Sequence, residues 1–297
     1  MAHTQPGKLA VWYLAARPKT LWAAMAPVVI GSALACEAGG FHLWSALAAL
    51  TGAVLIQIGT NYANDYYDFI KGADEGERLG PLRVTQAGLV TPSAMRSATL
   101  LVFSAALVIG IYLVMRGGWP IVIIGLLSIL FGIIYTAGPF PLGYNGLGEV
   151  FVLIFFGPVA VGGTYYVQTL QIGWEVLVLG LSPGLFSIAI LAINNLRDID
   201  NDRRASKGTL AARFGRTFAR LEYLLAILLG SLIPSLLWIT NHAPTGALLT
   251  LATLPAALPA FRAVMSGTEG PRLNDVLATT GKLLLLFSIL LSVGWLL

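Results

Sequence analysis

The chain has 297 residues, of which 57% are hydrophobic and only 11% are charged, with a mean hydropathy of +0.79. Soluble globular proteins carry roughly a quarter charged residues, so this composition excludes a soluble fold and indicates an integral membrane protein. The net charge of +4 does not require nucleic acid as a partner, because the basic residues follow the membrane topology described below. The single cysteine, Cys36, excludes an internal disulfide.

Nine apolar runs are long enough to cross a membrane, for which a helix needs about 20 residues. The runs are continuous rather than alternating in polarity, which excludes a β-barrel. We therefore expect an all-α fold, a polytopic membrane protein that forms one transmembrane domain over residues 1–297. The expected spans are 20–38, 43–65, 94–115, 119–137, 148–168, 175–196, 218–240, 244–264 and 276–297.

The basic residues sort to one side of these spans. Of the 18 Lys and Arg residues, 17 fall on one side and only Arg116 falls on the other. The positive-inside rule then places the N-terminus and the loops after the second and sixth spans in the cytoplasm, and the C-terminus on the opposite side. We expect a multi-pass protein of the inner or plasma membrane.

The first acidic motif is NDYYDFIKGAD, from Asn64 to Asp74, which ends the second apolar run. If the helix continues through it, Asn64 and Asp68 share one face because they are four residues apart. Asp65 lies on the neighbouring face, and Asp74 follows the expected end of the helix. Carboxylates this close repel one another unless a proton or a cation intervenes. Lys71 offers one positive charge against three negative ones, so a divalent metal is the better neutraliser.

The second acidic motif is NNLRDIDND, which begins at Asn194 and ends the sixth apolar run. Asn194 and Asp198 repeat the spacing of Asn64 and Asp68, 130 residues further on. Asp202 adds a carboxylate one turn after Asp198. Two acid-rich helix ends of the same design predict two halves of one site.

Each motif is followed by a basic loop, with Arg78 and Arg83 after the first and Arg203, Arg204 and Lys207 after the second. Mg²⁺ takes few protein carboxylates and bridges to phosphate oxygens, while Arg adds bidentate contacts to such oxygens. This chemistry suits a diphosphate, and an isoprenyl diphosphate is the donor that fits a membrane cavity. Aromatic rings can stabilise the allylic cation left by the diphosphate, although interfacial Tyr is ordinary in membrane proteins. The candidate rings are Tyr66, Tyr67, Tyr135, Tyr144, Tyr165 and Tyr166.

Four segments resemble the UbiA-type intramembrane prenyltransferases. They are residues 16–35, 64–88, 135–168 and 194–215, about a third of the chain, and they include both acidic motifs. Within that superfamily the chain is most similar to the 1,4-dihydroxy-2-naphthoate prenyltransferases of the menaquinone and phylloquinone pathways. In many members of the superfamily, the third acid of the first motif lies four residues after the second. Here the residue four positions after Asp68 is Gly72, and the third acid is Asp74. This spacing resembles the naphthoate branch.

The resemblance implies nine helices around a central cavity. It implies transfer of an isoprenyl group from an isoprenyl diphosphate to 1,4-dihydroxy-2-naphthoate, with loss of CO2 and diphosphate. It also implies two Mg²⁺ ions, a lipid bilayer as the surroundings and no obligate protein partner. Arg17 is expected to meet the acceptor's carboxylate or the diphosphate. The implied catalytic metal ligands are Asn64, Asp68, Asp198 and Asp202, with Asp74 as a further ligand directly or through water. Asp65 and Asp200 are expected to support these ligands. The implied substrate-binding residues are Arg17, Lys71, Arg78, Arg83, Arg203, Lys207 and Tyr144.

Three alternatives remain open at this point. One is another UbiA-type aromatic prenyltransferase. A second is a cation-coupled transporter whose internal repeat carries the duplicated motif, although its acids would lie near mid-membrane rather than beside basic cytoplasmic loops. A third is a CDP-alcohol phosphatidyltransferase, but the chain has no D-G-x-x-A-R run. Magnesium-dependent release of diphosphate from an allylic donor separates prenyl transfer from the second and third alternatives, because a transporter releases none.

Overall fold

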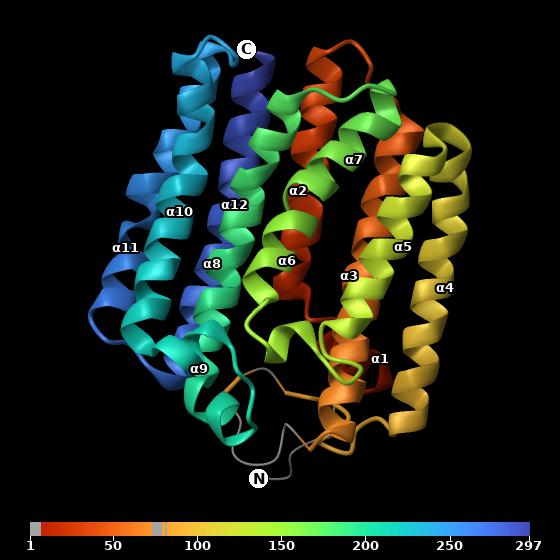
Figure 1. The fold of residues 1–297 in the computed structure, drawn as a ribbon, viewed down its shortest axis with the longest axis vertical. Helices are drawn as coiled ribbons and strands as arrows, with labels where there is room; N and C mark the ends of the chain where they lie inside the picture. The colour runs from red at the N-terminus through yellow and green to blue at the C-terminus, as the bar shows by residue number, and fades with distance from the viewer. Residues whose placement is uncertain (1–6, 73–78, 81) are drawn as a thin grey trace.

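The computed structural model describes residues 7–72, 79–80 and 82–297, and every regular element within these ranges is a helix. Most helices run along the long axis of the molecule (Figure 1). In hydrocarbon a helix satisfies its own backbone hydrogen bonds, which is why apolar runs adopt it. The elements are α1 (Lys8–Ala16), α2 (Pro18–Glu37), α3 (Leu43–Ile70), α4 (Pro92–Gly117), α5 (Trp119–Ile134), η1 (Leu142–Tyr144), α6 (Gly148–Phe155), α7 (Pro158–Thr169), α8 (Trp174–Arg204), α9 (Leu210–Phe214), α10 (Arg216–Ile239), η2 (Thr245–Ala252), α11 (Thr253–Met265), η3 (Gly270–Arg272) and α12 (Leu273–Leu296).

The all-α membrane fold predicted from the sequence is confirmed. In the described part of the chain, eight helical segments are long and apolar enough to cross a membrane. Three of these are composite, since α6 continues into α7, η2 continues into α11 and η3 continues into α12. The predicted span 119–137 corresponds to α5, which has only 16 residues. The count of nine spans therefore stays a prediction.

Helix α1 was not predicted. It is too short to cross a membrane, with nine residues, and lies at the end of the molecule where α3 finishes (Figure 1). Its buried residues Val11 and Ala15 pack in one cluster with Val84 and Met95. The chain reverses into α2 at Arg17, whose φ of 51° is left-handed. Helix α1 therefore covers the segment that follows the first acidic motif.

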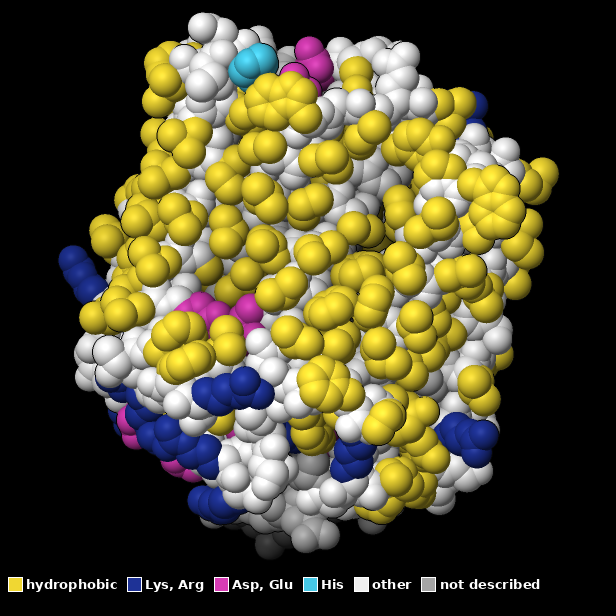
Figure 2. Space-filling model, viewed as in Figure 1, with side chains coloured by type: hydrophobic (Ala, Val, Ile, Leu, Met, Phe, Trp, Pro, Cys, Tyr) yellow, Lys and Arg dark blue, Asp and Glu magenta, His cyan; other side chains and the backbone are white. Residues whose placement is uncertain are grey.

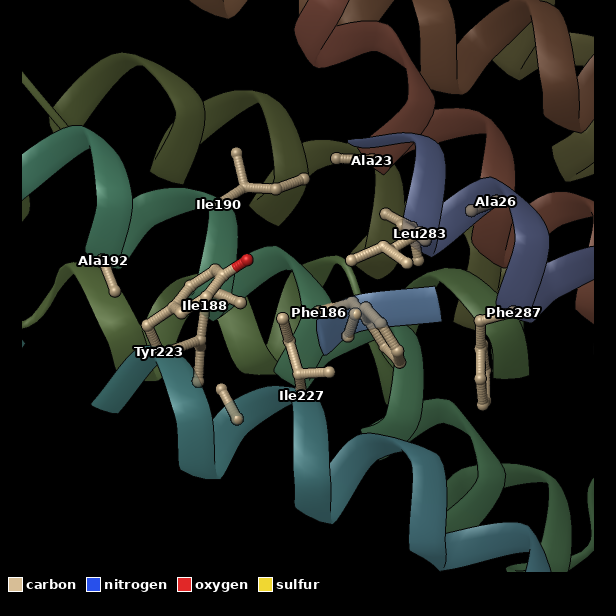
Figure 3. Close-up of a cluster of buried hydrophobic side chains, with 14 of the residues drawn as sticks. Ala23, Ala26, Phe186, Ile188, Ile190, Ala192, Tyr223, Ile227, Leu283 and Phe287 are labelled. Atoms are coloured by element: carbon tan, nitrogen blue, oxygen red, sulfur yellow. The ribbon is translucent and has the colours of Figure 1, made fainter. Parts of the chain in front are cut away.

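Helix α8 lies at the centre of the larger hydrophobic core. Figure 3 shows its Phe186 among side chains of α10 and α12, and the Phe186 and Phe287 rings lie 4.9 Å apart. On the other side, a Cβ added at Gly184 would lie 2.6 Å from the carbonyl oxygen of Leu153 in α6. The absence of a side chain at Gly184 thus allows α8 and α6 to approach backbone to backbone. Helix α8 is held on several sides, which fixes the direction of its C-terminal turns.

Helices α3 and α8 are longer than the membrane requires. They have 28 and 31 residues, or ~42 Å and ~46 Å at 1.5 Å per residue, against a hydrocarbon core of about 30 Å. Both run toward the end of the molecule where Lys and Arg side chains gather (Figures 1 and 2). Asn64 to Ile70 of the first motif and the whole second motif occupy their final turns, so these residues lie at this charged end.

Candidate active site

The first motif extends α3 as a regular helix up to Ile70. Asn64 and Asp68 lie on one face, as predicted, and Asn64 Oδ1 accepts a hydrogen bond of 2.6 Å from the Thr136 hydroxyl. Asp65 points elsewhere, since its Oδ1 accepts the backbone N–H of Thr85 at 3.2 Å. Asp65 therefore orders the segment after the motif, which is consistent with the supporting role expected for it.

Asp68 joins the two motifs. Its Oδ2 pairs with Arg83 Nη2 at 2.5 Å, and its Oδ1 pairs with Lys207 Nζ at 3.2 Å and accepts the Tyr144 hydroxyl at 2.6 Å. Lys207 follows the second motif, and the N–H of neighbouring Gly208 donates to the Tyr144 carbonyl at 2.8 Å. The carboxylate is only 4% exposed. Segments more than 130 residues apart thus converge on one buried acid, as the repeated spacing predicted.

The second motif presents Asp198 and Asp202 along one side of α8. Asp198 forms a two-pronged ion pair with Arg197, at 2.8 Å and 2.5 Å. Asp202 Oδ2 accepts the Thr209 hydroxyl at 3.4 Å. The carboxylate of Asp202 is close enough to those of Asp198 and Asp68 for their charges to repel. These carboxylates of the two motifs therefore lie in one region, where cations pair with two of them.

Lys71 lies on the other side of this region. Its Nζ donates to the carbonyl oxygens of Thr136 and Gly138, at 2.7 Å and 3.3 Å. Both Lys71 and Lys207 lie over the Tyr144 ring, with Nζ to centroid distances of 5.0 Å and 4.6 Å. Partial burial lowers the pKa of Lys71, an effect that the charge of Asp68 opposes and that of Lys207 reinforces. Tyr144 is thus surrounded by cations at the edge of the acidic region.

An apolar cavity of about 650 Å³ extends from this region into the helices. Asn64 and Tyr135 line its polar end, together with Asn61, whose amide donates to the Ala16 carbonyl at 2.9 Å. Arg17 follows Ala16, so the turn between α1 and α2 lies next to this end. A molecule with a charged head and a hydrocarbon tail fits such a shape.

Some predicted residues lie apart from this constellation. Asp200 is 53% exposed and pairs with Arg216 at 2.7 Å. Arg203 is exposed and donates to the carbonyl of Ala212 at 3.0 Å. The structure therefore does not bring Asp200 or Arg203 to Asp68. Asp74 and Arg78 lie outside the described residues.

The donor set of the site suits magnesium, although it is not a preformed metal cage. In the residues that the structure describes, no three Asp, Glu, His or Cys side chains form a metal-binding group. Asn64, Asp68, Asp198 and Asp202 offer only oxygen ligands, which Mg²⁺ prefers, and Mg²⁺ commonly uses one or two carboxylates plus substrate phosphates. The residues present are therefore compatible with ions that arrive together with a diphosphate.

Sequence reasoning missed three residues of the site. Thr136 and Thr209 donate hydroxyl hydrogen bonds to Asn64 and Asp202, and isolated threonines carry no pattern that would reveal this. Arg197 was taken only as one of the basic residues that set the topology. A signal was present, because Arg197 lies inside the acidic motif and directly precedes Asp198.

Comparison with known proteins agrees with this geometry. Residues 24–295 match the model of the UbiA prenyltransferase family. The chain is 40% identical to the 1,4-dihydroxy-2-naphthoate octaprenyltransferase of Mycobacterium leprae, over 94% of each chain. It is 37% identical to the protein of the same name from Escherichia coli, over 99% of this chain and 97% of that protein.

Solved structures share the fold at low sequence identity. A UbiA homolog from Archaeoglobus fulgidus bound to GPP and Mg²⁺ superposes with a TM-score of 0.71 at 11% identity, over 96% of this chain and 99% of that one. The apo UbiA homolog from Aeropyrum pernix K1 gives a TM-score of 0.70 at 16% identity, over 94% and 97%. The resemblance first seen in the acidic motifs thus extends over nearly the whole chain, which belongs to the UbiA prenyltransferase family.

Proposed function

We propose that this protein transfers an isoprenyl group from an isoprenyl diphosphate to 1,4-dihydroxy-2-naphthoate, in quinone biosynthesis. One observation carries the proposal: Lys207, from the second motif's loop, pairs with Asp68 of the first motif beside the polar end of an apolar cavity. Relatives of 37–40% identity that bear the name of this activity support the naphthoate acceptor and an octaprenyl donor.

The diphosphate binds among the cations that surround Asp68. Arg83, Lys207 and Lys71 supply N–H donors there, and charge-assisted contacts to phosphate oxygens are strong. We assign the same role to Arg78 from its position in the sequence after the first motif. These donors stabilise the negative charge that grows on the departing diphosphate, which is electrostatic catalysis in a site shielded from water. The tail extends into the cavity between the helices.

Asn64, Asp68, Asp198 and Asp202 would hold two magnesium ions, and Asp74, which lies outside the described residues, would assist them directly or through water. When bound, Mg²⁺ neutralises the diphosphate and makes it a better leaving group. Asp65 and Thr136 keep the first motif in place, through Thr85 and Asn64 respectively.

Transfer breaks the bond between the allylic carbon and the diphosphate oxygen, and the electron pair leaves with the diphosphate. The ring carbon that bears the acceptor's carboxylate then forms the new carbon–carbon bond. The bond to the carboxylate breaks, CO2 leaves, and its electron pair restores the aromatic ring. Tyr144 stands beside Asp68, where its ring can stabilise the allylic cation. Arg17, beside the polar end of the cavity, meets the acceptor's carboxylate.

The test is product formation by the purified protein in lipid nanodiscs. We expect magnesium-dependent release of diphosphate and a prenylated, decarboxylated product with the naphthoate acceptor and octaprenyl diphosphate. Asp68→Asn and Asp198→Asn should each lower turnover at least 100-fold, because loss of a metal ligand should cost more than loss of its outer partner, which commonly costs roughly 10- to 100-fold. Folding is checked by size-exclusion chromatography and melting temperature.

The matched control is Asp275→Asn, which removes an exposed carboxylate from the first turn of α12. Its turnover should equal that of the wild type. Wild-type rates in Asp68→Asn or Asp198→Asn would refute the metal assignment. Binding of the donor without any release of diphosphate would instead favour a transporter.

A further inference from the structure

Arg197 is the single basic residue within the second motif, and its side chain is only 1% exposed. Its guanidinium donates to both oxygens of Asp198, through Nε at 2.8 Å and Nη2 at 2.5 Å. Nη2 also donates to Asn194 Oδ1 at 2.7 Å. A single rigid fork therefore orients both residues that repeat the N-x-x-x-D spacing.

The same guanidinium is tied to two other segments. Its Nη1 donates to Asn274 Oδ1 at 2.8 Å, in the first turn of α12. Asn274 in turn donates through Nδ2 to the carbonyl oxygen of Leu79 at 3.0 Å. A Cβ added at Gly80 would lie 2.6 Å from Arg197 Nη2, so the backbone after the first motif packs directly on the guanidinium. Arg197 and Asn274 thus link the second motif to the chain that follows the first.

This arrangement differs from that of the cations at Asp68. Arg83 and Lys207 come from connecting segments, and an ammonium on a flexible stem can turn toward an arriving phosphate. Arg197 is fixed by partners on α8 and α12 and by the packing of Gly80. Its two bonds to Asp198 use one lone pair on each oxygen, and an ionised carboxylate has about four such acceptor sites. Asp198 therefore retains lone pairs for a metal while its orientation is set.

We propose that Arg197 is a positioning residue for the transfer reaction, which holds Asn194 and Asp198 in the orientation that magnesium requires. Through Asn274 it also fixes the position of these two residues relative to residues 79–80. Helix α12 therefore contributes to the site although it carries no acidic motif. The proposal rests on the function proposed above, in which Asp198 binds the metal. Outer partners that orient metal ligands commonly change affinity 10- to 100-fold when they are replaced.

The test measures metal affinity without turnover. Mn²⁺ replaces Mg²⁺, the donor is an unreactive thiodiphosphate analogue, and bound Mn²⁺ is counted by electron paramagnetic resonance. Arg197→Lys keeps the charge but removes the fork, and we expect its Mn²⁺ dissociation constant to rise roughly 10- to 100-fold. Asn274→Ala leaves the motif itself intact and should raise the constant about tenfold. The Mg²⁺ concentration for half-maximal rate should rise in parallel, with the acceptor KM unchanged.

The control is Arg262→Ala, which removes an exposed arginine from the last turn of α11 and should bind Mn²⁺ like the wild type. A purely structural role for Arg197 would lower the melting temperature of Asn274→Ala and leave its Mn²⁺ affinity unchanged, and that result would overturn the proposal. Asp198→Asn separates the two hypotheses. If Asp198→Asn is inactive while Arg197→Lys and Asn274→Ala bind Mn²⁺ normally, only the positioning role fails. If Asp198→Asn is fully active, the function proposed above fails first.

Discussion

At the scale of single residues, Asp68 depends on donors from three separate segments. Arg83 belongs to the segment after α3, Tyr144 ends η1, and Lys207 follows α8. A buried carboxylate without partners is strongly destabilising, so these segments must close on Asp68 for the site to form. The same donors are the ones that a diphosphate needs. The arrangement of these side chains therefore links folding of the charged end of the molecule to binding of the isoprenyl diphosphate.

Arg83 provides a test at this scale. Arg83→Ala should raise the KM for the isoprenyl diphosphate at least tenfold, because a strong contact to the phosphate oxygens is lost. Arg83→Lys keeps the charge without the fork and should recover part of the affinity. The KM for the naphthoate acceptor should change little. Steady-state kinetics with each substrate varied in turn measures both constants.

The matched control for Arg83 is Arg96→Ala, which removes an exposed arginine from the start of α4. It should leave both KM values unchanged. If Arg83→Ala altered only the acceptor KM, Arg83 would belong to the acceptor site rather than the donor site.

At the scale of elements, α3 and α8 were predictable together with their motifs. Apolar runs followed by N-x-x-x-D spacing indicated helices that carry acids on one face, and the structure places Asn64 and Asp68 accordingly. The convergence of the two motifs was predictable from their likeness alone. The ion pairs at the end of α8 were not predictable, because Glu269 lies far along the chain. Asp200 is two residues from both Asp198 and Asp202, so the helix directs it to another face. There it pairs with Arg216, which also pairs with Glu269.

Helix α1 shows another limit of the sequence. KLAVWYLAA is apolar but has nine residues, too few for a span, and its position depends on tertiary contacts. The Tyr62 hydroxyl donates to the Trp12 carbonyl at 3.3 Å, and Asn61 donates to Ala16. No local pattern in residues 8–16 predicts these contacts with α3.

The contact between α8 and α6 can be tested by adding one methyl group. Gly184→Ala places a Cβ against the Leu153 carbonyl and the Gly157 backbone, so the helices must separate. Overpacking of this kind costs roughly 1–3 kcal/mol, and the melting temperature in detergent should fall. Gly110→Ala in α4 is the matched control, since its Cβ would meet nothing within 4 Å. That variant should be neutral or gain roughly 0.5–1 kcal/mol of helix stability. Equal melting temperatures would contradict the close contact.

At the scale of the whole molecule, the two ends differ in how many charged side chains they carry. Figure 2 shows Lys and Arg gathered toward the end that holds the acidic motifs, beyond a broad band of hydrophobic side chains. The C-terminal end of α12 lies at the opposite end (Figure 1). The sequence predicted this division from the 17 basic residues on one side. A protein oriented by the positive-inside rule would therefore perform its chemistry at the cytoplasmic surface.

Labelling of single cysteines in intact cells tests this orientation. Cys36→Ser removes the one native thiol, after which a cysteine is placed at Glu37 or at Arg204. Both positions are exposed, at the C-terminal ends of α2 and α8, and these helix ends lie at opposite ends of the molecule (Figure 1). A membrane-impermeant maleimide added outside should label Glu37→Cys and leave Arg204→Cys unlabelled until the membrane is opened. The reverse pattern would place the site on the outer surface and contradict the predicted orientation. Both variants must retain wild-type turnover, so that the labelled population is the folded one.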